Sequence, residues 1–430
     1  MTYRPRYHFA PPFGWMNDPN GLCQFNGVYH MFYQYHPFGV EWDDMHWGHA
    51  TSYDLIHWEH KPIALRPGQD YDRDGVFSGS ALNVDGVLHL YYTGNVWLDE
   101  QREELKQVQC LATSTDGVTF TKHPNNPLIT GEPERGNAHV RDPKVWTENG
   151  RYYMILGTRD VKDGKVVLYE SNDAIHWTER GVIAGETGEH GWMWECPDLF
   201  SLDGRDVLLL SPQGMEPDDD RYHNLHQCGY FIGSLDVDTP VYKHGTFTEL
   251  DYGHDFYAAQ TFQDDRGRRI LIAWNAMWER NWPEQAEGWT NQMTLPRELS
   301  LRNGRLYMTP IEEVTILRRT SEQIDGTPFE GDALELTFSA IGDFTLHCFG
   351  DTATFSKQGD VLELKRDGDI RRIKADGRTF RIFIDASSIE VFVNDGEYVF
   401  SSRIYSQHRI KHKLSGHITE ATLFRFTDNR

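Results

Sequence analysis

The sequence predicts an all-β chain in which a five-bladed β-propeller is followed by a C-terminal β-sandwich. Three observations lead to this prediction: hairpin turns recur about every 60 residues, a second turn motif keeps the same period, and the 3.6-residue hydrophobic period of helices is almost absent. The length of 430 residues also exceeds the ~250 to 300 residues that one hydrophobic core usually serves, so two domains are expected.

The hairpin signal is an Asn or Asp followed by Gly between β-rich runs. Four such pairs end at Gly27, Gly86, Gly150 and Gly204, and a weaker Arg-Gly pair ends at Gly267. These glycines are 59, 64, 54 and 63 residues apart, which predicts one hairpin in each of five blades. The strands expected directly after the glycines cover residues 28–35, 87–93, 151–156, 206–210 and 269–274.

A second motif, Ser-x-Asp-x-x-x followed by Trp or Phe, begins at Ser52, Ser114 and Ser171, with a weaker copy at Ser234. Because it shares the period of the hairpins, it favours five four-stranded blades over the alternative of one large sandwich or barrel. It recurs outside the strands that carry the candidate acids, so we expect its residues to be structural. Its aspartates are assigned to turns and its tryptophans to blade packing: Asp54, Asp116, Asp173, Trp58 and Trp177.

The repeat fades after residues 295–299, and three regions are expected. Residues 1–309 form the catalytic propeller, residues 310–325 a mostly polar linker with a short helix over 311–319, and residues 326–430 the β-sandwich. In the last region, short runs of alternating apolar and polar residues are separated by Gly and Asp turns. Its expected role is to stabilise the propeller or to modify access to its site.

Acidic residues fall at matching places in the repeat. Asp18 and Glu195 lie nine residues before their hairpin glycines and Asp142 lies eight, while Ser78 and Tyr257 occupy the equivalent positions in the other two repeats. If these strands are the innermost of each blade, three carboxylates meet in one central channel. Like charges brought together raise at least one pKa and cost stability, which indicates a function. A nucleophilic carboxylate beside a proton-donating carboxyl is typical of retaining glycoside hydrolases.

The neighbours of the acids predict different roles for them. Arg141 directly precedes Asp142, and its guanidinium is expected to keep that carboxylate ionised, which suits a transition-state stabiliser better than a proton donor. Pro19 and Gly21 predict a bend of the chain at Asp18, at the mouth of the channel. The proton donor is expected to have a raised pKa, so that it can protonate the leaving oxygen.

Four motifs occur in order at these places: W-M-N-D-P-N-G at 15–21, F-S-G-S at 77–80, R-D-P at 141–143 and E-C-P-D at 195–198. They resemble the motifs of glycoside hydrolase family 32, which contains invertases, fructanases and sucrose-6-phosphate hydrolases. The resemblance covers the propeller, whereas the C-terminal region agrees chiefly in position and size.

The resemblance implies a role for each acid: Asp18 as nucleophile, Asp142 as transition-state stabiliser and Glu195 as acid/base. Its implied activity is hydrolysis of terminal β-D-fructofuranosyl residues of sucrose and fructo-oligosaccharides, through a covalent fructosyl-enzyme and without a cofactor. It also implies a sugar-binding set, in which Trp274 and Trp282 are alternatives to the last member: Trp15, Asn17, Gln34, Trp42, Phe77, Ser78, Arg141, Tyr257 and Trp278.

Several alternatives stay open on the sequence. The substrate could instead be sucrose 6-phosphate, or a sugar could replace water as acceptor in a transfructosylation. A sugar-binding propeller without activity and an inverting arabinan-degrading propeller are further hypotheses. Recognition of a phosphorylated substrate would require a basic cluster near the outer pocket.

Composition limits the partners of the chain. The 42 Lys and Arg and 65 Asp and Glu give a net charge of -23, which repels nucleic acids and anionic membranes. Apolar runs long enough for a leader or a membrane span do not occur, so a cytoplasmic location is expected. A small-molecule sugar is the expected partner. The oligomeric state stays open, with a homo-oligomer among the alternatives.

Metal and thiol chemistry are not expected. Five scattered cysteines, an odd number, argue against a disulfide framework and a zinc site, and they are interpreted as reduced thiols. His46 and His49 are spaced so that their rings do not share one face of a strand. No motif places a histidine to activate Cys196 as a nucleophile. The acidic run 216–220 is expected to be a solvated loop, with calcium binding as its alternative.

Overall fold

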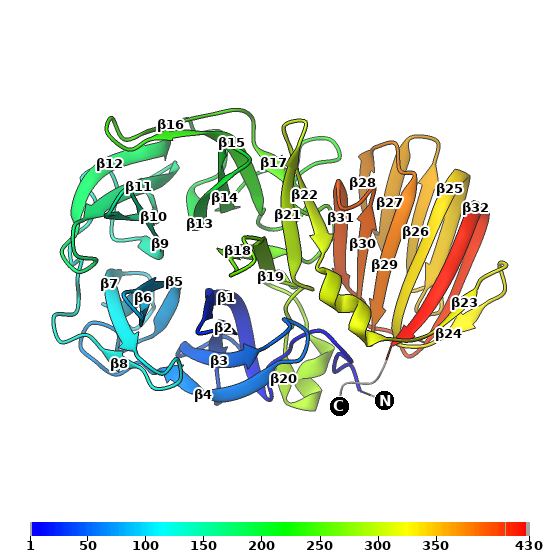
Figure 1. Cartoon of the computed structure of the whole chain (residues 1–430), viewed down its shortest axis with the longest axis horizontal. Helices are drawn as coiled ribbons and strands as arrows, with labels where there is room; N and C mark the ends of the chain where they lie inside the picture. Colours follow the sequence, from blue (N-terminus) through cyan, green and yellow to red (C-terminus); the bar gives the residue numbers. More distant parts are fainter. Residues whose placement is uncertain (1, 409, 427–430) are drawn as a thin grey trace.

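The computed structural model describes residues 2–408 and 410–426, and Figure 1 shows a ring of five β-sheets with a second β-domain beside it. In each sheet of the ring, four antiparallel strands follow one another in chain order from the centre outward. These sheets are blades 1 to 5, and the predicted five-bladed propeller is confirmed.

The blades are built from short strands. Blade 1 contains β1 (Gly14–Phe25), β2 (Val28–His36), β3 (His46–Ser52) and β4 (Glu59–Leu65). Blade 2 contains β5 (Val76–Val84), β6 (Val87–Trp97), β7 (Leu105–Ser114) and β8 (Thr121–Lys122). Blade 3 contains β9 (Val140–Glu148), β10 (Arg151–Arg159), β11 (Gly164–Ser171) and β12 (Thr178–Gly185). Blade 4 contains β13 (Met193–Leu202), β14 (Arg205–Gln213), β15 (Gly229–Asp236), β16 (Val241–His244) and β17 (Thr248–Glu249). Blade 5 contains β18 (Tyr257–Gln263), β19 (Arg269–Trp274), β21 (Arg297–Arg302) and β22 (Arg305–Pro310).

The first two strands of each blade join as predicted. In blades 1 to 4 the Asn or Asp before the hairpin glycine has φ between 49° and 52°, and the glycine has φ between 76° and 82°. Positive φ at both central residues is the requirement of the two-residue turn that matches the twist of a β-hairpin. The strands expected after the glycines are β2, β6, β10, β14 and β19.

The second motif forms turns, also as predicted. Oδ1 of Asp54 accepts hydrogen bonds from the amides of Ile56 and His57, at 2.9 and 2.8 Å. Asp116 and Asp173 bind the corresponding amides of their own turns. These aspartates lie on the outer connections of the blades and have no part in the site described below.

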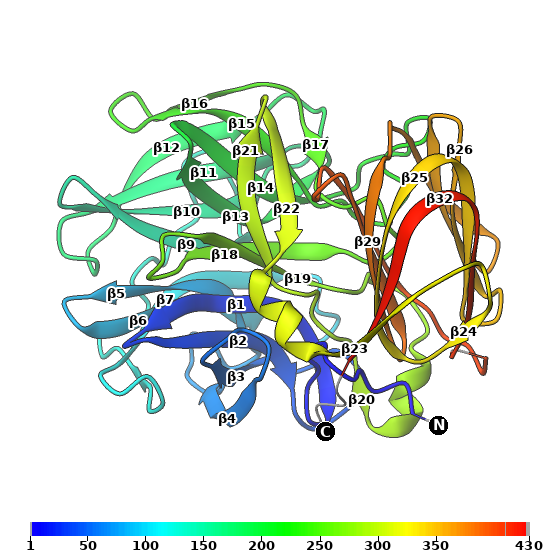
Figure 2. The same ribbon diagram turned by 45° about the vertical axis from the view of Figure 1, so that its right-hand side comes forward.

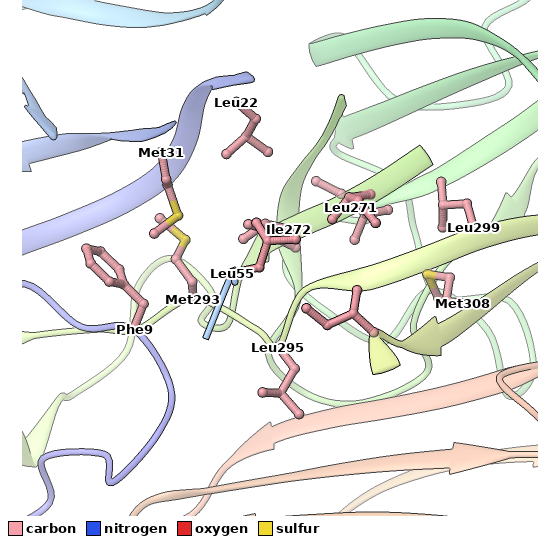
Figure 3. Close-up of a cluster of buried hydrophobic side chains, with 14 of the residues drawn as sticks. Phe9, Leu22, Met31, Leu55, Leu271, Ile272, Met293, Leu295, Leu299 and Met308 are labelled. Atoms are coloured by element: carbon pink, nitrogen blue, oxygen red, sulfur yellow. The ribbon is translucent and has the colours of Figure 1, made fainter. Parts of the chain in front are cut away.

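The ring closes between blades 5 and 1. The chain leaves β19, passes through the 3-10 helix η1 (Pro283–Glu287) and forms β20 (Trp289–Thr290), which pairs in parallel with Gly14 and Trp15 of β1. Figure 3 shows the buried cluster that joins these blades, with Leu22 and Met31 of blade 1 near Leu271 and Ile272 of blade 5. The two ends of the ring are therefore held by backbone pairing and by apolar packing.

The second domain is one hydrogen-bonded sheet that folds over on itself. The 16-residue strand β25 pairs with β29 along its first half and with β26 along its second half. The ring centroids of Phe355 in β26 and Phe400 in β31 lie 5.4 Å apart although three strands separate β26 from β31 along the sheet path, so the two halves pack face to face. Its strands are β23 (Arg318–Gln323), β24 (Phe329–Glu330), β25 (Ala333–Cys348), β26 (Ala353–Gln358), β27 (Val361–Arg366), β28 (Asp369–Lys374), β29 (Thr379–Asp385), β30 (Ser388–Val393), β31 (Tyr398–Arg403) and β32 (Lys411–Phe426).

The segment between the domains is shorter than the expected linker 310–325. A 3-10 helix, η2 (Glu312–Leu317), follows β22 directly, within the span expected to hold a short helix. The next residues form β23, which pairs with β32 and so belongs to the second domain. Figure 2 shows this domain standing against blade 5.

A buried polar network fastens the two domains together. Arg297 of blade 5 contacts Asp251 at 3.1 Å and Glu390 of β30 at 2.6 Å, and all three side chains are fully buried. His8, from the N-terminal segment, bridges Glu390 and Asp385 at 2.7 Å each. Because residues 251–257 lead into β18, this network also fixes the strand that carries Tyr257.

Candidate active site

Every innermost strand carries one extra residue at the level of its candidate side chain. The pairing of β1 with β2 slips between Met16 and Pro19, around Asp18, and β5 slips at Ser78. The same irregularity lies around Asp142 in β9, after Glu195 in β13, and after Tyr257 in β18. Such β-bulges bend a strand and redirect its side chains, and they recur beside active sites. Five aligned bulges therefore turn these side chains toward one place at the centre of the ring.

Asp18 is held by neighbours that fix both of its oxygens. Asn17 donates a hydrogen bond of 3.1 Å to Oδ1, and the hydroxyl of Ser78 donates one of 2.6 Å to Oδ2. The thiol of Cys196 lies 3.6 Å from Oδ2. Burial raises the pKa of Asp18 above its ordinary value, the Ser78 hydrogen bond lowers it, and the charge of Glu195 raises it further. The carboxylate is thus oriented and poorly hydrated, as a nucleophile requires.

Glu195 is surrounded by hydrogen-bond donors. Arg141 donates to Oε1 through Nη2 at 2.8 Å and through Nε at 3.1 Å. Oε2 accepts from the hydroxyl of Tyr257 at 2.6 Å and from the amide of Gln213 at 2.8 Å. Burial acts to raise the pKa of Glu195, but Arg141 and the Tyr257 hydrogen bond outweigh it, and the pKa lies below its ordinary value.

Asp142 has left-handed backbone geometry, with φ 64°. Its Oδ2 accepts a hydrogen bond of 2.8 Å from the amide of Cys196, and its own amide donates to Thr93. Burial raises its pKa to about 7; Arg141 acts in the opposite direction, whereas the charges of Glu195 and Asp18 raise it further.

These pKa shifts correct two expectations from the sequence. Arg141 was expected to keep its neighbour Asp142 ionised, but its guanidinium contacts Glu195 on the next blade, and burial dominates at Asp142. The proton donor was expected to have a raised pKa, whereas Arg141 lowers the pKa of Glu195. Adjacency in a strand misleads here because successive side chains point to opposite faces and the bulge at Asp142 redirects them again.

Aromatic rings form the wall of the site. Trp15 stacks on Trp278 with ring centroids 6.0 Å apart, and Trp42 meets Phe77 edge to face at 5.9 Å. Trp274 and Trp282, the alternatives to Trp278, are 0% and 4% exposed, whereas the Trp278 side chain is only partly buried. A sugar could therefore reach Trp278 but not the other two rings.

Asn17 and Gln34, two more of the predicted sugar-binding residues, hold their neighbours in place. The indole of Trp15 donates to the amide oxygen of Asn17 at 2.9 Å, so hydrogen bonds connect Trp15 through Asn17 to Asp18. Gln34 is buried and donates to the carbonyl of Val76, which joins β2 to β5. No hydrogen bond links Gln34 to the three acids in the described part of the chain, so the structure places it beside them and not in contact with them.

Sequence reasoning missed Gln213, Thr93 and Gln107, each of which binds a member of the site. Gln213 lies on β14, which pairs with β13, but its partner in the register is Met193, whereas Glu195 pairs with Ser211. No motif or offset in the sequence marks any of these three residues.

Metal binding and disulfides find no support in the described residues. No group of three or more His, Cys, Asp or Glu side chains there could hold a metal ion. The five cysteines are free thiols in the structure. Across the same residues, no helix is long and apolar enough to cross a membrane.

Known proteins resemble the chain over nearly its whole length. Residues 8–310 match the family model described as "Glycosyl hydrolases family 32 N-terminal domain", and residues 311–424 match "Glycosyl hydrolases family 32 C terminal". A sucrose-6-phosphate hydrolase of Escherichia coli is 48% identical over 326 residues, 75% of this chain and 68% of that protein. A raffinose invertase of Escherichia coli is 46% identical over 333 residues, 77% of this chain and 69% of that protein.

Solved structures share the fold. The GH32 β-fructofuranosidase of Bombyx mori superposes with a TM-score of 0.90 at 38% identity, over 99% of this chain and 94% of that one. The sucrose-6-phosphate hydrolase of Lactobacillus gasseri superposes with a TM-score of 0.91 at 29% identity, over 100% and 94% of the two chains.

Proposed function

This chain belongs to glycoside hydrolase family 32, and we propose that it hydrolyses the terminal β-D-fructofuranosyl bond of sucrose 6-phosphate and of sucrose, with retention at the anomeric carbon. The observation that carries the proposal is the meeting of Asp18, Asp142 and Glu195 on bulges of three innermost strands. The similar proteins named sucrose-6-phosphate hydrolase favour the phosphorylated substrate over sucrose alone.

In the first step, Asp18 attacks the anomeric carbon of the fructosyl unit while Glu195 protonates the departing oxygen. The bond from that carbon to the glycosidic oxygen breaks, and an ester to Asp18 forms. Asn17 and Ser78 hold the two oxygens of Asp18, so one lone pair can face the sugar without rotation of the carboxylate. Asp142 stabilises the positive charge that develops on the ring.

The proton on Glu195 depends on substrate binding. In the free site Arg141 lowers its pKa, so hydroxyls that accept the Arg141 hydrogen bonds would release Glu195 and raise its pKa. Tyr257 and Gln213 keep the carboxyl in place meanwhile. In the second step Glu195 takes a proton from water, which attacks the ester and frees Asp18.

The proposal is tested by kinetics and stereochemistry on one preparation. The kcat/KM values for sucrose 6-phosphate and sucrose are measured beside those for kestose, inulin and levan, and we expect hydrolysis of the first two. Asp18→Asn and Glu195→Gln should each lose turnover. Proton NMR should show the β-anomer of fructofuranose as the first product. A first product of inverted configuration would contradict the retaining mechanism, and trisaccharides at high sucrose would assign transfructosylation.

A further inference from the structure

A basic cluster lies at the rim formed by the end of β10 in blade 3 and the start of β13 in blade 4, where the charge of Arg141 acts on both of its basic residues and that of Glu195 on one. Arg159 ends β10, His139 directly precedes β9, and Nη2 of Arg159 donates to Nε2 of His139 at 2.8 Å. The guanidinium also packs over the ring of Trp192, 4.9 Å from the centroid. Trp192 directly precedes β13, and its side chain is 38% exposed. Blades 3 and 4 thus each contribute to this rim.

The charge of Arg159 is not neutralised. No carboxylate of the described residues lies within ion-pair distance of it, and its Nε is buried without a hydrogen-bond partner. The neighbouring arginines differ, since Arg135 pairs with Glu186 and Arg141 pairs with Glu195. Burial and the charge of Arg141 lower the pKa of Arg159, so the bare cation carries an energetic cost. Acidic residues are abundant in this chain, whose net charge is -23, so its composition does not explain why Arg159 has no carboxylate beside it.

His139 supplies a second donor. A guanidinium can only donate hydrogen bonds, so Nε2 of His139 accepts from Arg159 and the ring hydrogen resides on Nδ1. Burial and the charges of Arg141 and Arg159 lower the pKa of His139 to about 4, which keeps the ring neutral. The pair offers an anion a charged fork and a neutral N–H group.

The position of the cluster relates it to the leaving sugar. Asp18 attacks from blade 1, and Glu195 on blade 4 protonates the departing oxygen, so the leaving sugar extends from Glu195 toward the rim of blades 3 and 4. We propose that Arg159, together with His139, binds a phosphate group on the leaving sugar, and that this subsite sets the preference for a phosphorylated over a neutral aglycone. The inference rests on the proposed function and deepens it.

The test compares kcat/KM for sucrose 6-phosphate and for sucrose in four proteins: the wild type, Arg159→Gln, Arg159→Lys and Arg135→Gln. A hydrogen bond to a charged group contributes enough for Arg159→Gln to lower the ratio of the two kcat/KM values about 10- to 100-fold. Arg159→Lys, which keeps the charge without the fork, should fall in between. Arg135→Gln is the matched control, because its side chain is 61% exposed and already paired, and it should leave the ratio unchanged.

The ratio separates phosphate binding from a structural role of Arg159. A variant that merely disturbs Arg141 would lower kcat/KM for both substrates equally and keep the ratio, and that result would overturn the inference. Hydrolysis of sucrose but not of sucrose 6-phosphate by the wild type would also overturn the inference.

Binding gives a readout that does not depend on hydrolysis. In isothermal titration, glucose 6-phosphate should bind the wild type more tightly than glucose, and Arg159→Gln should abolish the difference. If the wild type hydrolyses neither substrate, the proposed function fails, and the titration still decides the phosphate subsite: equal binding of glucose and glucose 6-phosphate would refute it.

Discussion

The amide of Cys196 donates a hydrogen bond of 2.8 Å to Oδ2 of Asp142, so the residue next to Glu195 is fastened to the acid of the neighbouring blade. The thiol of the same residue lies 3.6 Å from Oδ2 of Asp18. One bulge residue, with φ 48°, therefore contacts two acids and adjoins the third. The geometry of the triad is set by backbone shape as much as by the acids themselves.

Removal of Arg141 should move the pH dependence of activity. Its guanidinium favours the ionised forms of Glu195 and Asp142, so Arg141→Gln should raise the pKa values of both. We expect a lower kcat/KM and a pH profile whose limbs both lie at higher pH. Arg151→Gln is a suitable control, because Arg151 lies in the same blade and pairs with Glu170 at an exposed site. An unshifted profile in Arg141→Gln would contradict the role assigned to the Arg141 contact.

How far the sequence predicts this site can be judged from its bulges. The hairpin glycines placed Asp18, Ser78, Asp142, Glu195 and Tyr257 at similar depth because a fixed turn fixes the register of the strand before it. The offsets varied by up to two residues because strands absorb extra residues in bulges, such as the second slip of β1 after Asn20. Bulges depend on contacts between blades, which a single sequence does not display.

Partners across blades were the part that could not be predicted. The pairing of Arg141 with Glu195 joins residues 54 apart, and that of His8 with Glu390 joins residues 382 apart. No local pattern encodes such contacts, because they depend on how the blades and domains pack. The expectation that Arg141 keeps Asp142 ionised was therefore wrong, because Arg141 pairs with Glu195 and burial raises the pKa of Asp142.

Cys196 should be chemically inert. Burial and the three nearby carboxylates raise its pKa well above the ordinary range, and the side chain is 2% exposed. Treatment of the native protein with iodoacetamide should leave activity unchanged, with peptide mass spectrometry showing Cys196 unmodified. Cys23, which is only partly buried, serves as the internal comparison. Rapid alkylation of Cys196 with loss of activity would mean that the site opens more than the structure indicates.

His8 should make stability depend on pH. Burial lowers its pKa, but hydrogen bonds to Asp385 and Glu390 outweigh burial and raise it to about 9, above the unfolded value of 6.5. The charged form therefore adds stability that is fully present below pH 6.5 and is lost as the pH rises through 9. The urea midpoint should fall between pH 6.5 and 9.5 in the wild type and less steeply in His8→Gln. Parallel curves for the two proteins would refute this linkage.

Arg297 should be essential to the joint between the domains. Arg297→Ala leaves Asp251 buried without a cation and Glu390 with His8 as its remaining cation, and breaking a buried pair costs about 3 to 5 kcal/mol. Arg425→Ala, which removes an exposed partner of Glu322, should cost less than about 1 kcal/mol. Calorimetry would measure the loss of stability in each variant, and equal melting temperatures for the two variants would contradict the assigned role of Arg297.

Asp18 should form a covalent ester to the fructosyl unit, and trapping this intermediate would identify the nucleophile. The Glu195→Gln variant should react with an aryl β-D-fructofuranoside, because the leaving group of such a substrate needs no proton. The fructosyl-enzyme should then accumulate, because no general base is present to activate the attacking water. After rapid quenching and digestion, mass spectrometry should locate one fructosyl group on Asp18. A fructosyl group on Asp142, or no adduct together with an inverted product, would mean that Asp18 is not the nucleophile.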